Sequence, residues 1–158
     1  HGIEHCNGKY IIMGDADDSY NFLELSLFIE RLQAGYDMVM GNRFAGGITK
    51  GAMPWLHRYV GNPFLSSLGR FLFKNNIGDF HCGLRAFTKK CYNIINPQCN
   101  GMEFASELVA LASIHQMRIC EIPVTLYPDG RKRRPHLRSW RDGFRHMVLL
   151  YSLYLLRN

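Results

Sequence analysis

The sequence lacks the cysteine patterns that bind zinc or staple a small secreted domain. Its five cysteines, Cys6, Cys82, Cys91, Cys99 and Cys120, are odd in number and include neither a Cys-x-x-Cys pair nor the spacing of zinc ligands. This pattern favours a reducing compartment over an oxidising one.

A segment that could cross a membrane is also missing. We expect a strongly apolar helix from Trp140 onward, but its last uninterrupted apolar stretch falls short of the roughly 20 residues that a bilayer requires. Such a helix could lie in a membrane interface, lead into membrane spans beyond Asn158, or simply pack on the core. No signal peptide is visible, and the first residue is His1 rather than a start methionine.

Most of the chain carries no net charge. Residues 1–126 hold eleven Lys and Arg against eleven Asp and Glu, whereas residues 127–158 hold eight against two and supply the whole formal charge of +6. The basic run at residues 130–141 therefore indicates phosphate, acidic lipid or nucleic acid as a partner.

What is present is typical of one globular domain. The 158 residues are 47% hydrophobic and 20% charged, a composition that can bury a core. Near the N-terminus the sequence changes abruptly from hydrocarbon to charge. Residues 10–13 are expected to form a short buried strand, and the carboxylates of Asp15, Asp17 and Asp18 follow it directly.

Ligands of open α/β sheets bind outside the carboxyl ends of the strands. Asp15 and Asp17 could there present hard oxygen ligands to Mg²⁺ or Mn²⁺, which in turn favours the phosphate oxygens of a nucleoside diphosphate. Alternatively, Asp18 or Ser19 caps the next helix, and both interpretations can hold at once. Because such a site normally needs strands before this one, we expect the chain to be a fragment that is inactive alone.

An arginine is expected at the same edge of the sheet. Residues 22–32 show apolar positions at helical spacing, and residues 36–40 form a second strand that leads to Arg43. A strand, helix and strand in this order make the two strands parallel, so Arg43 should emerge beside Asp15 and Asp17. It could hold a phosphate oxygen or form a salt bridge with one of these aspartates.

The next segment combines a loop with an apolar helix. Residues 45–53 are rich in glycine, which predicts a mobile lid over a ligand site. A helix follows at residues 64–73, and Gly61 and Pro63 weaken helical structure before it. His57 and Arg58 could contact an anionic substrate or lie on a solvated helix face.

Residues 78–87 are expected to form a turn and a short strand. Asp79, His81 and Cys82 could in principle bind a metal or form a Cys/His nucleophile, but the sequence offers no matching ligand pair elsewhere.

Two helices and a strand are expected after it, the helices at residues 89–95 and from Gly101 onward. The second carries Glu103 and Glu107 at i and i+4, for which an exposed helix face is the default, although one of them could point into the site. The strand, at residues 118–127, contains Pro123 and therefore belongs at a sheet edge or a bulge.

Taken in order, the motifs resemble those of the family 2 glycosyltransferases, in particular the polyprenol-phosphate (dolichol-phosphate) mannosyl- and glucosyltransferases. Asp15-Ala16-Asp17 resembles their DxD motif and Gly41-Asn42-Arg43-Phe44 their strand-end arginine motif. Residues 79–85 resemble the D-x-x-x-G-x-R segment, and residues 131–139 resemble the arginine-rich loop. The resemblance implies an α/β fold of the GT-A, Rossmann-like type with a mixed sheet flanked by helices, of which this chain holds the C-terminal part.

The resemblance also implies a role for each candidate residue. Asp15 and Asp17 would hold Mg²⁺ or Mn²⁺, Asp15, Asp17 and Asp18 would bind the donor, and Asp17, Arg43 and Asp79 would take part in catalysis. The acceptor phosphate would be bound by several basic residues and one serine: Arg43, Arg58, Arg131, Arg133, Arg134 and Ser139.

The implied reaction is an inverting transfer of a hexose from a nucleotide sugar, of the UDP-glucose or GDP-mannose class, to a polyprenyl (dolichyl or undecaprenyl) phosphate. It would take place at the cytoplasmic face of a membrane and without a nucleic-acid partner. Residues 1–138 would then form a partial GT-A catalytic domain, and residues 139–158 a membrane-proximal helix.

Two other functions fit parts of the sequence. One is a phosphohydrolase with Asp15 as nucleophile and Asp17 as acid and base, although the further acidic pair that such enzymes use does not follow Asp79. The other is a nucleic-acid-binding module built on the basic run, in which Trp140 is the one interleaved aromatic residue.

Overall fold

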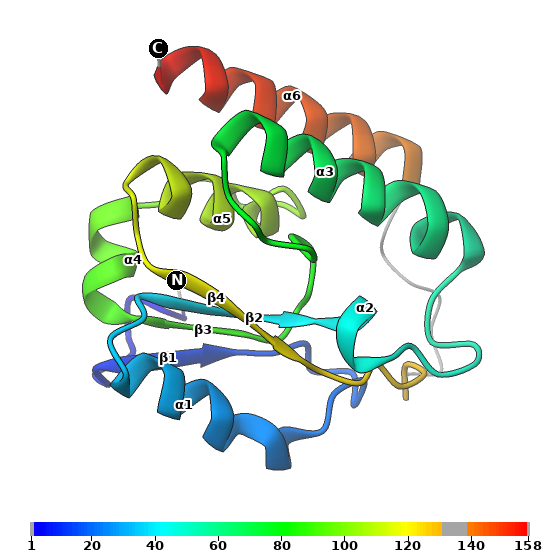
Figure 1. Ribbon diagram of the computed structural model, residues 1–158, viewed down its shortest axis with the longest axis horizontal. Helices are drawn as coiled ribbons and strands as arrows, with labels where there is room; N and C mark the ends of the chain where they lie inside the picture. The colour runs from blue at the N-terminus through cyan, green and yellow to red at the C-terminus, as the bar shows by residue number, and fades with distance from the viewer. Residues whose placement is uncertain (1, 131–138, 158) are drawn as a thin grey trace.

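The computed structural model describes residues 2–130 and 139–157, and it shows a mixed four-stranded sheet with helices on both faces (Figure 1). The strands are β1 (Tyr10–Met13), β2 (Met38–Asn42), β3 (Arg85–Thr88) and β4 (Ile119–Pro123). The α-helices are α1 (Leu25–Gln33), α2 (Arg43–Gly46), α3 (Asn62–Phe73), α4 (Lys89–Ile95), α5 (Phe104–Ile114) and α6 (Ser139–Arg157). A 3-10 turn η1 (Phe22–Glu24) precedes α1, and a π-helical turn η2 (His57–Gly61) precedes α3.

The order of strands in the sheet is β1, β3, β2, β4. Strand β3 pairs antiparallel with both β1 and β2, and β4 pairs parallel with β2. Because β1 and β2 both run opposite to β3, they point the same way, as the strand, helix and strand pattern predicts. The sequence does not predict that β3 lies between them. The carboxyl ends of β1 and β2 therefore share one edge of the sheet.

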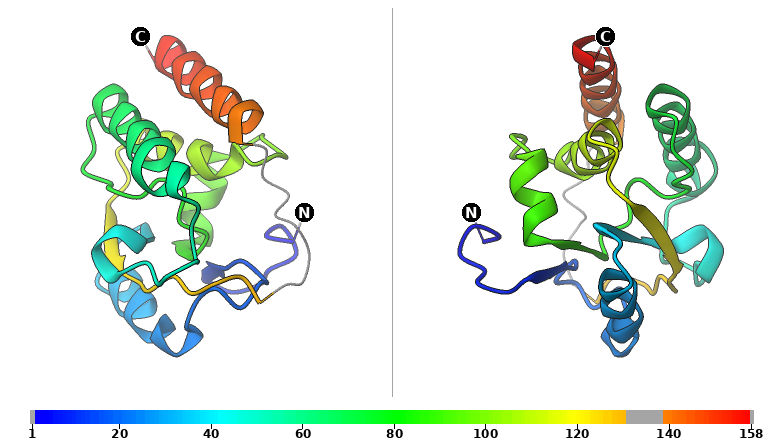
Figure 2. Two further views of the ribbon diagram at one scale, coloured as in Figure 1. Left: turned by 90° about the vertical axis from the view of Figure 1, so that its right-hand side faces the viewer. Right: turned by 60° about the vertical axis from the view of Figure 1, so that its left-hand side comes forward.

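Alternation along the strands divides the core into two layers. Met38 and Met40 of β2 pack on one face of the sheet with residues of α4 and α5, whereas Val39 packs on the other face with Phe28 of α1. Views from two further directions show α1 alone on its side, opposite the larger group of helices (Figure 2).

Helix α6 lies in an outer layer on α3 and α5. Its Leu150 is fully buried in a small cluster with Leu72, Phe73 and Ala110. Apolar side chains on the rest of the helix, including Phe144 and Leu156, stay exposed. Helix α6 thus combines core packing with an uncovered apolar face, and none of the helices in the described residues is long and apolar enough to span a membrane.

Local details confirm some boundaries and correct others. Pro123 lies on β4 at the sheet edge, as predicted. The 3-10 turn η1, which leads directly into α1, is capped by Asn21, whose Oδ1 accepts a hydrogen bond from the Leu23 backbone N–H, so the prediction of a cap at Asp18 or Ser19 is wrong. The segment containing Gly61 does not lose helical structure, because η2 continues directly into α3.

Candidate active site

The carboxyl end of β1 carries the acidic motif into contact with the turn before β3. Asp15 is exposed to solvent, and its carboxylate lies directly against Gly83, so that a Cβ on Gly83 would overlap it. The first aspartate of the acidic motif and Gly83 of the turn before β3 therefore form one surface.

Asp17 is half-buried and already organised by its neighbours. Its Oδ1 accepts hydrogen bonds from both the backbone N–H and the hydroxyl of Ser19, while its backbone carbonyl accepts one from the N–H of Gly130 at 2.9 Å. Asp18 next to it is exposed and adopts a left-handed backbone with φ of 61°. Gly130, the first residue of the segment at 130–141, therefore contacts the acidic motif.

The remaining acceptor candidates divide into two groups. Arg131, Arg133 and Arg134 lie outside the described residues, and Ser139 is placed only as the first residue of α6. Arg58 is half-buried on η2, where its guanidinium lies 5.4 Å from the ring centre of Tyr59 and Nη1 donates a 3.5 Å hydrogen bond to the Ile48 carbonyl. The structure therefore places Arg58 on a partly covered surface rather than on a fully solvated helix face.

Arg43 and Asp79 form a buried bidentate pair. Nε and Nη2 of Arg43 donate to the two carboxylate oxygens of Asp79, both at 2.7 Å, and the backbone N–H of Arg43 adds a third hydrogen bond of 3.1 Å. Although burial alone would lower the pKa of Arg43, the hydrogen bond and charge of Asp79 hold it above its ordinary value.

This pair corrects the alternative that Arg43 bridges to an aspartate of the acidic motif, because its partner is Asp79. Asp79 is fully buried, whereas Arg43 keeps 8% exposure. A catalytic contribution of Asp79 would therefore act through Arg43, and that role stays a prediction.

Tyr20 holds the turn before β3 through its hydroxyl group, a contact that sequence reasoning missed. Its hydroxyl accepts hydrogen bonds from the backbone N–H of Gly83 at 3.1 Å and from the thiol of Cys82 at 3.7 Å. Burial raises the pKa of Cys82 to about 11, so its thiol stays protonated at neutral pH. Cys82 is fully buried and serves packing, so it is not placed to act as the Cys/His nucleophile that the sequence allows in principle.

Arg85 also serves the turn. Its side chain is buried, and its guanidinium donates to the carbonyl of Cys82 and, at 3.0 Å, to that of Ala105 on α5. Burial lowers the pKa of Arg85. The second arginine of the site therefore holds backbone in place.

Two glutamates that we expected on an exposed helix face are buried. The carboxylate of Glu107 accepts hydrogen bonds from the backbone N–H groups of Gln98 and Cys99, at 3.0 and 2.8 Å. Glu103 pairs with Arg145 of α6. Both serve tertiary structure, because Glu107 holds the segment before α5 and Glu103 links the start of α5 to α6.

A hydrogen-bonded chain links the turn to α6. Nε2 of His81 lies 2.9 Å from the hydroxyl of Ser106, which lies 2.8 Å from Nδ1 of His146. Nδ1 of His81 is buried and has no hydrogen-bond partner among residues 2–130 and 139–157. The two rings contact each other edge to face, with their centres 4.8 Å apart.

The predicted lid is partly fixed. The backbone N–H of Thr49 donates to the carbonyl of Leu126 at 3.0 Å, and the N–H of Leu126 donates to the carbonyl of Gly47. Residues 47–49 are therefore tied to the chain after β4, and a movement of residues 50–53 stays a prediction.

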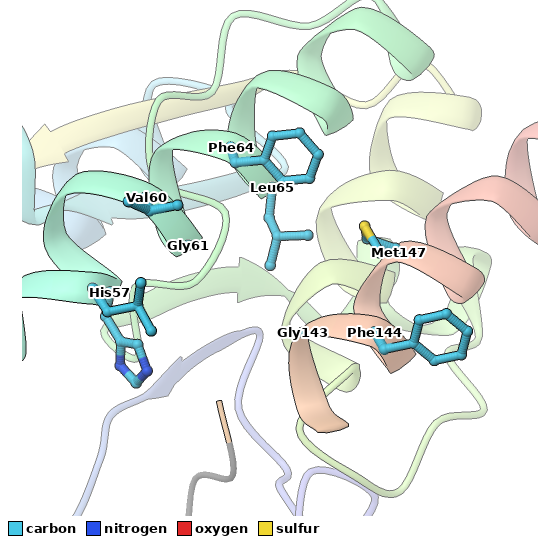
Figure 3. Close-up of a pocket in the computed structure, with 9 residues that line it drawn as sticks. His57, Val60, Gly61, Phe64, Leu65, Gly143, Phe144 and Met147 are labelled. Atoms are coloured by element: carbon cyan, nitrogen blue, oxygen red, sulfur yellow. The ribbon is translucent and has the colours of Figure 1, made fainter. Parts of the chain in front are cut away.

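An apolar groove lies between η2, α3 and the start of α6 (Figure 3). Its cavity measures about 360 Å³. It is lined by Leu56, His57, Val60, Gly61, Phe64, Leu65, Gly143, Phe144 and Met147. His57 lies at one end, where burial and the charge of Arg43 lower its pKa. Because two helices far apart in sequence make this groove, periodicity alone could not predict it.

The donor set at the edge fits a divalent cation that takes its remaining ligands from a substrate. Asp15 and Asp17 supply hard carboxylate oxygens at the rim, which suit Mg²⁺ or Mn²⁺. Within residues 2–130 and 139–157, no group of three or more His, Cys, Asp or Glu side chains could hold a metal ion. A two-carboxylate site completed by phosphate oxygens is thus the arrangement that these residues allow.

Comparison with known proteins gives a consistent result. A protein-family model described as glycosyl transferase family 2 matches residues 1–94. A low-salt glycan biosynthesis hexosyltransferase of Haloferax volcanii is 38% identical over 93% of this chain and 35% of its own length. A polyprenol monophosphomannose synthase of Mycolicibacterium smegmatis is 30% identical over 70% of this chain and 43% of its own length.

The chain thus spans between a third and a half of the length of these relatives. Among solved structures, glucosyl-3-phosphoglycerate synthase of Mycobacterium tuberculosis superposes with a TM-score of 0.64 at 14% identity, covering 99% of this chain and 52% of that one. At this identity the likeness concerns the fold, and it confirms the predicted GT-A architecture. A structure of the same synthase contains Mn²⁺ and UDP-glucose.

Proposed function

Because the chain belongs to glycosyl transferase family 2, we propose that it is part of an enzyme that transfers a hexose from a nucleotide-diphosphate sugar to a polyprenyl phosphate, with inversion. The observation that carries this proposal is the meeting, at one sheet edge, of the exposed Asp15 carboxylate, the Arg43–Asp79 pair and the start of the basic run at Gly130. Such a site presents a cation-binding side and an anion-binding side.

The acidic side would bind the donor. Asp15 and Asp17 would hold Mg²⁺ or Mn²⁺, and the ion would neutralise the charge of the leaving nucleoside diphosphate. The hydrogen bonds from Ser19 fix the Asp17 carboxylate before any ligand arrives, and Asp18 lies at the rim beside it. The donor would be of the UDP-glucose or GDP-mannose class, which agrees with the UDP-glucose complex of the structural neighbour.

The basic side would bind the acceptor phosphate. Asp79 fixes the Arg43 guanidinium through two of its nitrogens, so its orientation is set before binding. A phosphate nucleophile is already anionic and needs little general-base help. Positioning by Arg43 and Arg58, with charge neutralisation by Arg131, Arg133 and Arg134, would therefore supply most of the catalysis.

The groove between η2, α3 and α6 would take the first isoprene units of the acceptor. Its lining is almost wholly apolar, and His57 at its end lies close enough to Arg43 for their charges to interact. An acceptor with a phosphate head and a hydrocarbon tail matches this arrangement. Two relatives are named as a dolichyl-phosphate hexose transferase and a polyprenol monophosphomannose synthase, which supports the same acceptor class.

A lipid acceptor implies a membrane surface, which we propose to be the cytoplasmic face. The exposed apolar side chains of α6 follow a basic run, so hydrocarbon burial and electrostatic attraction would act together. Each Lys or Arg near an anionic surface contributes about 1 kcal/mol before screening by salt. Binding to anionic vesicles should therefore weaken at high salt and yet persist.

The test is a transfer assay with the intact protein that carries this chain. Radiolabelled UDP-glucose and GDP-mannose are offered with Mn²⁺, and the acceptor is either a polyprenyl phosphate in detergent or a soluble phosphate such as 3-phosphoglycerate. We expect labelled lipid and no labelled soluble product. Transfer to the soluble phosphate alone would overturn the acceptor assignment, and hydrolysis of a phosphate ester that requires Asp15 would favour a phosphohydrolase.

A groove variant with a matched control sharpens this test. Phe144→Ser, in the groove, should raise the KM for polyprenyl phosphate severalfold without a comparable change in the donor KM. Phe71→Ser changes an 81% exposed phenylalanine on α3 that does not line the groove, and it should leave both values close to those of the unaltered protein. Equal effects of the two substitutions would remove the groove from the acceptor site.

A further inference from the structure

Glu121 on β4 contacts the backbone of the turn that carries Asp79, the partner of Arg43. Its two carboxylate oxygens accept hydrogen bonds from successive backbone N–H groups, those of Gly78 and Asp79, each at 2.9 Å. A carboxylate that accepts from two adjacent amides fixes the orientation of both peptide planes, and charge makes these bonds stronger than neutral ones.

The position of Glu121 in the sheet explains this contact. It pairs with Met40 in the parallel ladder between β2 and β4, and its neighbour Ile122 is buried on the α1 side of the sheet. Alternation of side chains therefore directs Glu121 to the opposite side, where the turn before β3 begins. Strand β2 continues from Met40 to Asn42, and Arg43 follows at the start of α2, so the edge strand β4 borders both partners of the buried pair.

We infer that Glu121 is a positioning residue for the acceptor site, acting on Arg43 through the turn at residues 78–79. The inference rests on the proposed function, in which Arg43 binds the acceptor phosphate. Asp79 holds Arg43 with both of its oxygens, so the place of the guanidinium depends on the Asp79 backbone. That backbone is held in turn by Glu121.

A merely structural role for Glu121 has a different signature. It would change the fraction of folded protein and hence the apparent kcat, while both KM values stayed as they were. A positioning role raises the KM for the acceptor phosphate selectively, because the displaced group is one that contacts the acceptor and not the donor.

The first measurement is amide hydrogen exchange on this chain. Glu121→Gln keeps the size of the side chain, but it replaces one acceptor oxygen by an NH₂ group that cannot accept from the second amide. We expect exchange at Gly78 or Asp79 to become about tenfold faster, the change in opening equilibrium that follows from losing one charge-assisted bond. Glu30→Gln, on the exposed surface of α1, is the matched control and should leave these amides unchanged.

The second measurement is kinetic and uses the intact protein. Glu121→Gln should raise the KM for polyprenyl phosphate about tenfold and leave the donor KM within about twofold. In a double-mutant cycle with Arg43→Lys, the doubly substituted protein should be no worse than Arg43→Lys alone, because both changes act through the same guanidinium. If Glu121→Gln fails to fold, Glu121→Asp keeps the charge and takes its place.

Each possible result either supports or contradicts the positioning role of Glu121. Unchanged exchange at Gly78 and Asp79, or fully additive effects of the two substitutions on acceptor KM, would overturn it. So would faster exchange with an unchanged acceptor KM when Arg43→Lys does raise that KM. If neither substitution alters acceptor KM while exchange becomes faster, the proposed acceptor role of Arg43 fails, and the hold of Glu121 on the turn is supported.

Discussion

Gly83 leaves the space that the Asp15 carboxylate occupies, although 68 positions separate these two residues in the sequence. The contact joins the acidic motif after β1 to the turn that carries Asp79. A side chain at position 83 would have to displace the carboxylate, since the rest of the turn is held by hydrogen bonds to Tyr20 and Glu121.

Gly83→Ala should therefore weaken metal-dependent donor binding more than it weakens the fold. We expect at least about a tenfold loss of affinity for a nucleotide sugar in the presence of Mn²⁺, measured by calorimetry on the intact protein, because a carboxylate moved by about 1 Å no longer matches the ion. Gly2→Ala, where a Cβ meets no atom within 4 Å, serves as the control. Unaltered donor affinity would show that the Asp15 carboxylate does not act in the position described.

Asp17→Asn should abolish metal-dependent transfer while the protein stays folded. A metal ligand stabilises developing charge by several kcal/mol, so we expect a rate loss on the order of 100-fold or more in the intact protein. Circular dichroism and thermal unfolding check that the fold is intact. Ordinary turnover of this variant with Mg²⁺ or Mn²⁺ would contradict the proposed metal site.

Asp79→Asn should lower stability strongly, because it leaves the Arg43 guanidinium buried without its counter-charge. Breaking a buried ion pair from one side costs about 3–5 kcal/mol. Urea unfolding of the chain measures the loss, and Arg70→Ala, which removes an exposed arginine from α3, should cost less than about 1 kcal/mol. The double change of Arg43→Met and Asp79→Leu should recover much of the stability without recovering transfer. If Asp79→Asn lowered the free energy of unfolding as little as Arg70→Ala does, the buried pair would not stabilise the fold as described.

Stability should also fall in mild acid because of His81 and His146. Burial lowers the pKa of both imidazoles below their ordinary value of 6.5, and for His81 the nearby charge of His146 adds to this effect. The unfolded chain then binds more protons than the folded one as the pH decreases. The stability that this pair contributes is complete above about pH 6.5 and is lost below it, by up to about 1.4 kcal/mol per pH unit for each histidine.

Denaturant unfolding between pH 5 and 7.5 measures this slope. His146→Gln removes one titrating group and should flatten the slope, although Glu103 and Asp142 beside His146 partly oppose the lowering of its pKa. His115→Gln, at the exposed end of α5, should keep the slope of the unaltered chain. Identical slopes for all three proteins would assign the acid sensitivity to other groups.

Donor and metal together should protect residues 50–53 from hydrogen exchange if this segment closes over the site. The hydrogen bonds of residues 47 and 49 to Leu126 provide a fixed base for such a movement. Mass-spectrometric exchange with and without UDP-glucose and Mn²⁺ measures it in the intact protein. Equal exchange in both conditions would argue against a lid.

Sequence reasoning placed Asp15 and Arg43 at one edge of the sheet through local patterns that have a direct physical meaning. The abrupt change from the apolar β1 to Asp15 and Asp17 marks a strand end, and the helix between β1 and β2 implies that Arg43 reaches the same edge. Pro123 could be assigned to an edge strand because it lacks an N–H group. These inferences need only neighbours in sequence and the rules of strand connection.

The parts that sequence reasoning missed depend on contacts between distant segments. Arg43 and Asp79 are 36 positions apart, and nothing in either motif alone identifies the other as its partner. Glu107 looks like an exposed helix residue until the segment at Gln98 and Cys99 folds over it. One signal was available for Asn21, since an asparagine immediately before a helix is a preferred cap, yet Asp18 and Ser19 nearby compete for the same role.

The antiparallel strand β3 lies between β1 and β2 and so fixes the distance between the two sides of the proposed site. Two spacings of neighbouring strands, about 10 Å, separate the chain that carries Asp15 from the chain that carries Arg43. Backbone hydrogen bonds set this gap, so exchanges of side chains at the rim leave it unchanged. If the proposed function holds, a lineage could alter its donor or its acceptor by changing the surrounding loops, while the distance between the two sides of the site stays the same.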